Sequence, residues 1–133
     1  MGVQYKHKKT CFTLLKSMER DHDIKPGSIF RVKERIWLSI CTADIDDEKV
    51  VTTRPTRGYM QQYKVEVDDH IMFLDVVYDP YMKKHLLRFL YGSKMVALTH
   101  QKGRTLKEIK QCMTLVPIQH SIGVPLVVET PDA

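Results

Sequence analysis

Two of the six histidines in this chain could act together in acid–base chemistry. His85 and His100 flank a hairpin whose loop is predicted at residues 92–93. If the loop has only these two residues, His85 pairs with His100 across the antiparallel strands. Paired imidazoles could hold a metal ion or cleave RNA, but either role needs a third ligand or a positioned lysine. We therefore expect two half-exposed polar residues, with no metal site, no cofactor and no catalytic residue.

Several function classes lack their sequence signals. There is no glycine-rich phosphate loop, no nucleophile elbow and no zinc-protease motif. The acidic run that starts at Asp44 has Lys49 where a calcium loop needs glycine and Pro55 where it needs glutamate, so we interpret it as a solvated turn. No window approaches the length of an apolar membrane span, and no secretory signal is present. Three separated cysteines indicate reduced thiols and a cytoplasmic protein.

The histidine pair would be positioned by a meander of three antiparallel strands over residues 69–101. Its apolar runs are separated by an Asp-Pro turn and a Gly-Ser turn. The first strand is apolar on both faces, so we expect it to be central and covered on both sides. Simple alternation puts Val76 on the face opposite Phe73. Shorter strands are predicted at 28–33, 36–41, 50–53 and 114–118, with a polar edge strand at 59–67.

Helical spacing predicts two short helices beside the strands. The first covers 10–21, with Thr10 as its cap, after a loosely attached basic arm at 1–9. The second covers 105–112, where Thr105 and Glu108 have the spacing of a capping box. We therefore predict a single, mainly β domain: a small bent antiparallel barrel over 24–118 with two short helices and an extended tail at 119–133.

This order of elements resembles the small, highly bent barrels of the Tudor and KOW type. The resemblance is carried by 25–32 (KPGSIFRV), 67–74 (VDDHIMFL) and 105–108 (TLKE). It implies a module that binds nucleic acid or protein and is not an enzyme. The chain departs from the pattern at Asp68, where the barrels usually have glycine, and in a long loop over 43–70. It also resembles the compact, charged domains encoded in phage genomes.

Charge is distributed unevenly along the chain. Residues 1–35 carry nine Lys or Arg against four acids, residues 36–79 four against nine, and residues 80–133 eight against three. Basic ends around an acidic middle suit a polyanion, so the leading hypothesis is nucleic-acid binding through phosphates, with DNA favoured over RNA and a regulatory role. Flat aromatic rings and loop cations would make the contacts. The candidate nucleic-acid-binding residues are Arg31, Lys33, Arg35, Trp37, Arg54, Arg57, Tyr59, Lys83, Lys84, Arg88, Lys102 and Arg104.

Three alternatives stay open. The Trp37 ring could be exposed, although we favour its burial under the N-terminal helix. The domain could instead bind a host or partner protein, with the edge strand at 59–67 accepting a strand from it. The third hypothesis is a small nuclease that uses His85 and His100. The oligomeric state is left open.

Overall fold

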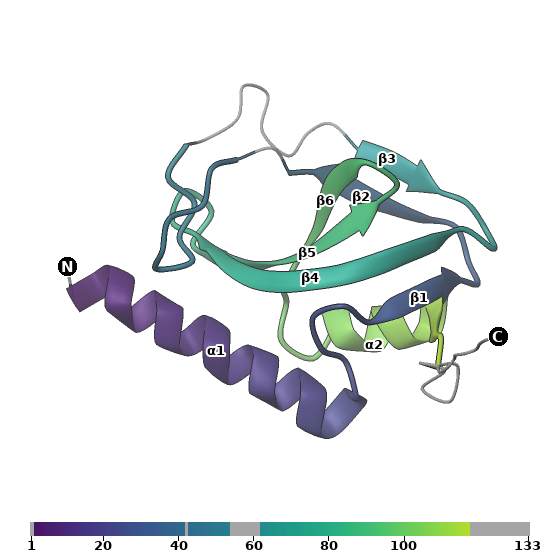
Figure 1. Cartoon of the computed structure of the whole chain (residues 1–133), viewed down its shortest axis with the longest axis horizontal. Coiled ribbons are helices and arrows are strands. Elements are labelled where there is room, and N and C mark those ends of the chain that lie inside the picture. Colours follow the sequence, from purple (N-terminus) through teal and green to yellow (C-terminus); the bar gives the residue numbers. More distant parts are fainter. Residues whose placement is uncertain (1, 42, 54–61, 118–133) are drawn as a thin grey trace, which may run out of the picture.

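The computed structural model describes residues 2–41, 43–53 and 62–117, with side chains from residue 6 onward. Seven antiparallel strands form a curled, half-barrel sheet in the order β3-β2-β6-β5-β4-β1-β7, and two helices lie together on one side of it (Figure 1). This confirms the predicted mainly β fold with one helix at each end. The elements are α1 Gly2–His22, β1 Ile29–Val32, β2 Ile36–Ile40, β3 Gln62–Val65, β4 His70–Asp79, β5 Lys84–Tyr91, β6 Lys94–Thr99, α2 Thr105–Cys112 and β7 Met113–Leu115.

The predicted meander is present as β4, β5 and β6. Tyr91 pairs with Lys94 across a two-residue loop, and Gly92 in that loop has a left-handed φ of +62°. In the wider turn between β4 and β5, the Asp79 carboxylate accepts a hydrogen bond from the backbone N–H of Tyr81. Both turns therefore use the residue types that their backbone geometry favours.

A bulge in β4 changes which of its residues share a face. The pairing of β4 with β5 shifts register between Phe73 and Asp75. Phe73 and Val76 consequently join the same core cluster, whereas Val77 joins a smaller cluster on the other side. Simple alternation had placed Val76 and Phe73 on opposite faces, and this was wrong because one extra residue reverses the alternation beyond it.

The core has two parts, separated by the sheet. Cys11 and Met18 of α1 and Ile109 of α2 pack into the main cluster with β4 and β5. The smaller cluster holds Cys41 and Val51 against the opposite face. β4 is thus central and covered on both sides, as its apolar pattern predicted. Neither helix among the described residues is long and apolar enough to cross a membrane.

The N-terminal helix is longer than predicted. Residues 2–9, expected to be a loose arm, form the first turns of α1. Thr10 is not its cap but lies inside the helix, where its hydroxyl donates to the His7 carbonyl oxygen at 2.9 Å. α1 runs obliquely beneath the sheet, along β4 (Figure 1). The contact with the sheet explains the extra turns, because docking stabilises helical residues that local propensity leaves undecided.

The C-terminal elements match the predicted positions but not the predicted cap. α2 spans the expected residues, yet its N-cap is Arg104 and no side chain caps it, so the capping box at Thr105 was wrong. The Thr105 hydroxyl is buried and accepts from Gln101 N–H while donating to the Thr99 carbonyl. Residues 50–53 form only isolated bridges within the described chain. The predicted tail from 119 lies outside the described residues.

Candidate nucleic-acid interface

Three of the predicted phosphate-binding arginines already have a carboxylate partner. Arg31 contacts Asp68 at 2.9 Å, and Arg35 contacts Glu66 at 3.2 Å, both as exposed pairs. Exposed pairs of this kind contribute little to stability and exchange readily with another anion. Both arginines therefore remain accessible to a phosphate, but their charge is already balanced by a carboxylate.

Arg88 is a different case, because its ion pair is largely enclosed. Its Nε and one terminal nitrogen each lie 2.7 Å from an oxygen of Asp75, and only 16% and 15% of the two side chains is exposed. The Asp75 hydrogen bonds are the main reason that the pKa of Arg88 is raised. Two of the five N–H donors of Arg88 are thus held by Asp75 in a largely enclosed pair, so a phosphate contact by Arg88 stays a prediction that this geometry disfavours.

Trp37 is exposed, not covered by the N-terminal helix. The residue is 53% exposed, and the Lys64 ammonium lies 5.9 Å from the ring centroid. Its neighbour Leu38 faces the main core on the helical side, so alternation directs Trp37 to the other face of the sheet. Trp37 is thus a possible stacking surface, but it does not lie with the helices.

The remaining predicted residues lie at the β4–β5 turn, around α2, or outside the described residues. Lys83 and Lys84 are exposed at the β4–β5 turn. Lys33, just after β1, lies beside the end of α2, where its N–H donates to the Cys112 carbonyl. Lys102 and Arg104 are exposed just before α2. Arg54, Arg57 and Tyr59 lie outside the described residues.

The largest concentration of positive charge is on the helices. We define the helical layer as residues 6–22 and 102–112. It carries nine Lys or Arg against three acids, whereas the rest of the chain carries twelve against thirteen. The exposed lysines that the sequence prediction missed here are Lys6, Lys8, Lys9, Lys16, Lys107 and Lys110.

The positive charge of α1 is not compensated inside the helix. Its first turn contains no acid, and Lys6, Lys8 and Lys9 lie near its N-terminus. Lys6 and Lys9 are three residues apart on the helix, a spacing at which like charges repel. Within the part of the layer that the structure describes, Arg20 and Asp21 form the only ion pair. An external anion would relieve this repulsion.

The predicted pairing of His85 with His100 is present, and His85 also joins α1 to the sheet. The backbone N–H of His100 donates to the His85 carbonyl at 2.8 Å, which confirms the register. His7 of α1 stacks on Tyr78 with centroids 3.7 Å apart, and Tyr78 meets the edge of His85 at 5.2 Å. Thr10 Oγ1 lies 3.1 Å from His85 Nε2. The cluster therefore joins α1, β4 and β5.

The hydrogen bonds indicate the direction of the contact between His85 and Thr10. The single Thr10 hydroxyl hydrogen is donated to the His7 carbonyl, so the oxygen accepts from His85 Nε2–H. Burial lowers the pKa of His85, with further lowering by the charges of His100 and His7, and burial alone lowers the pKa of His100. No group of three potential metal ligands occurs among residues 2–41, 43–53 and 62–117. In this arrangement His85 donates a hydrogen bond to Thr10 of α1.

The fold and its charges define a curled antiparallel sheet with a basic two-helix layer. No model of a protein family matches this chain, and no curated protein or solved structure matches it either.

Proposed function

We propose that this protein binds nucleic acid through phosphate contacts made by the helical layer, with DNA favoured over RNA. The observation that supports the proposal is the location of the charge. The two segments that hold the whole positive excess of the chain are far apart in sequence, yet both helices lie on the same side of the sheet (Figure 1). A concentrated positive face attracts a polyanion over a longer range than the same charges dispersed.

The dimensions of the layer suit a nucleic-acid backbone. The 21 residues of α1 extend about 30 Å at 1.5 Å per residue. Lys9 and Lys16 are seven residues apart, or about 10 Å along the axis, so they fall on one side of the helix. Phosphates recur every ~3.4 Å along a DNA strand, so a row of lysines can meet several of them. Phosphate contacts do not depend on base identity, and we expect little sequence preference.

A salt titration with charge-matched variants tests the proposal. We would measure fluorescence polarisation of a labelled DNA duplex and a single-stranded RNA between 50 and 200 mM salt. The variant Lys16→Glu/Lys107→Glu removes one cation from each helix, and Lys64→Glu/Lys94→Glu is the control with the same net charge. We expect the helical variant to lower the salt slope by about 2 and the control to change it little.

Two outcomes would contradict the proposal. The first is that neither the DNA nor the RNA binds even at 50 mM salt. The second is that the helical variant and the control variant lose affinity equally. The second result would mean that overall charge, and not the helical layer, drives the association. Lys83→Glu/Lys84→Glu provides a further comparison, because these lysines were predicted contacts outside the layer.

Protein binding by strand addition is the second candidate function. β3 is the terminal strand of the described sheet, and the exposed ring of Trp37 stands on the adjacent strand β2. A partner strand could pair with the free edge of β3 and pack beside that ring. Partner binding that persists at high salt and is lost in Trp37→Ala would favour this function. We also retain a reducing, cytoplasmic location, since Cys11, Cys41 and Cys112 are free thiols.

A further inference from the structure

A cavity of about 400 Å³ lies between α1 and the sheet. Its lining combines Cys11, Phe12 and Leu15 of α1 with Val76 of β4 and the stems of lysines. Cavities that bind small molecules begin at about 300 Å³ and are mostly apolar with a few placed polar groups. The cavity therefore has the size and composition of a site for a small ligand.

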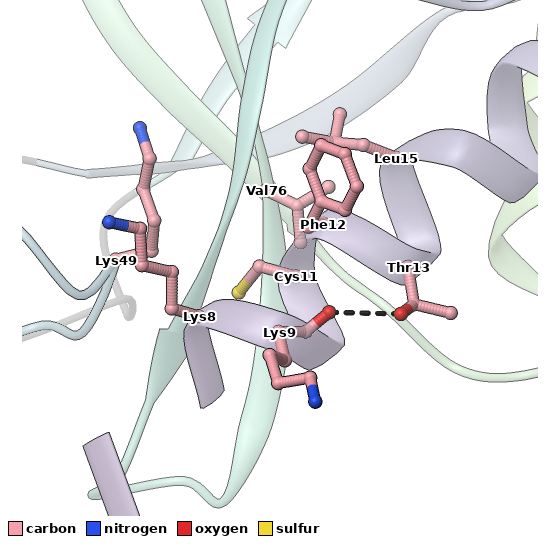
Figure 2. A pocket seen from close by; sticks show the side chains of 8 residues that line it. All are labelled: Lys8, Lys9, Cys11, Phe12, Thr13, Leu15, Lys49 and Val76. Carbon is pink, nitrogen blue, oxygen red and sulfur yellow. Dashed lines mark hydrogen bonds between the residues drawn. The ribbon is translucent and has the colours of Figure 1, made fainter. Parts of the chain in front are cut away.

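The cavity has a basic end and an apolar end. Figure 2 shows Lys8 and Lys49 extending together at one end, while Phe12 and Leu15 stand at the other. Phe12 is 57% exposed, which is unusual for so large an apolar ring. The Cys11 thiol between the two ends is neutral at pH 7, because burial raises its pKa to about 11. An occupant would need an apolar body and one acidic head.

The basic end carries a cation that the protein itself does not fully neutralise. Asp75 is held by two short bonds from Arg88, and the Lys49 ammonium is a second cation, 3.6 Å from the same carboxylate. The single Asp75 carboxylate thus contacts two cations. The Lys49 side chain is 42% exposed, so its ammonium is accessible to an incoming anion.

The backbone of Lys49 adds a second observation. Its φ is +64°, a left-handed conformation that glycine or asparagine adopts at lower cost. The conformation is fixed on both sides, because Lys49 N–H donates to Asp46 and the Lys49 carbonyl accepts from Tyr78 N–H. A long cationic side chain therefore occupies a position where a small residue would be more stable, and it projects over the cavity.

We propose that this cavity binds a small amphiphilic anion, such as an alkyl carboxylate. The chain of the ligand would lie against Phe12 and Leu15, and its carboxylate would lie between the ammonium groups of Lys8 and Lys49. Burial of the alkyl chain supplies most of the affinity. The head group selects anions over neutral or cationic analogues of the same length.

Calorimetry with three ligands of equal length tests the site. Decanoate, decan-1-ol and decylammonium would be titrated separately, below their micelle concentrations, into the full chain without nucleic acid. We expect decanoate to bind more tightly than either analogue. Lys49→Gln should weaken decanoate binding roughly threefold to fivefold and leave decan-1-ol unchanged, because an exposed ion pair is worth up to ~1 kcal/mol. Lys25→Gln is the matched control, since Lys25 is exposed and does not line the cavity.

The proposal fails if decanoate and decan-1-ol bind equally, if Lys49→Gln and Lys25→Gln have the same effect, or if no ligand binds at millimolar concentration. Phe12→Ala gives an independent check, because it shortens the apolar end without touching a buried core residue. It should weaken binding of decanoate and decan-1-ol alike.

A membrane-binding role for the cavity would give a different result with anionic vesicles. They would then bind Lys49→Gln as well as the unmodified protein, and that result would also contradict the proposal. These measurements contain no nucleic acid, so they succeed or fail separately from the proposed function.

Discussion

The enclosed ion pair between Asp75 and Arg88 predicts an asymmetric response to mutation. Asp75→Ala leaves the Arg88 guanidinium largely enclosed and without its acceptor, and the Lys49 ammonium then adds repulsion. Breaking a buried pair costs 3–5 kcal/mol and breaking an exposed one at most ~1 kcal/mol. Because about one-sixth of each side chain remains exposed, we expect Asp75→Ala to lower the free energy of unfolding by ~2–3 kcal/mol.

Arg88→Ala should cost less, about 1–2 kcal/mol, because Asp75 keeps Lys49 at 3.6 Å as a partner. The double variant should cost less than the sum of the two, with a coupling energy of about 1–2 kcal/mol. Urea unfolding followed by far-UV circular dichroism measures all three. Fluorescence is a poorer probe, since the single tryptophan, Trp37, is already exposed in the folded state.

Arg31→Ala is the control for this cycle, because it breaks the exposed pair with Asp68 and should change stability by at most ~1 kcal/mol. Two results would refute the reasoning: an Asp75→Ala cost no greater than that of Arg31→Ala, or an Arg88→Ala cost greater than that of Asp75→Ala. The first would mean that solvent screens the pair despite its burial. The second would mean that Lys49 does not stabilise Asp75.

Three other perturbations have outcomes that the structure specifies. The lowered pKa values of His85 and His100 mean that the unfolded state binds more protons, so unfolding free energy should fall as pH drops below ~6.5, towards the lowered folded values. Urea titrations from pH 8 to 5 should show that the unfolding free energy of His85→Gln/His100→Gln depends less on pH than that of the unmodified protein. An equal pH dependence would mean that these two histidines are not its cause. Thr105→Val should cost ~1–3 kcal/mol by removing a hydroxyl that serves two backbone groups, with Thr105→Ser recovering most of it in the same assay. Gly92→Ala should lower the thermal midpoint, because the left-handed backbone costs an alanine about 1 kcal/mol although its Cβ would meet no other atom. An unchanged midpoint would mean that the loop relaxes.

The strands were predictable because their signals are local. The loop at 92–93 fixes the register of β5 against β6, and counting outwards from it places His85 opposite His100. The same counting from the β4–β5 turn, where Asp79 pairs with Lys84, places Asp75 opposite Arg88. That signal was present in the sequence, and using it would have identified Asp75 as a partner of Arg88.

Other features depend on contacts between distant parts of the chain. No local pattern in the first strand of the meander announces the bulge that brings Val76 onto the same side as Phe73. The first turns of α1 have no distinctive apolar spacing, and they become helical where His7 stacks on Tyr78. Thr105 has the spacing of a cap, yet its hydroxyl is taken by the backbone of the preceding loop.

The fold separates positive charges that serve its own stability from those that do not. Arg88 satisfies a buried acid, and Arg31 and Arg35 neutralise nearby carboxylates. The lysines of the helical layer form no ion pair among the described residues, although the Lys16 ammonium lies over the Phe12 ring, 5.2 Å from its centroid. Their charge is therefore mostly available to an external anion. The proposed polyanion would convert the repulsion among these lysines into attraction.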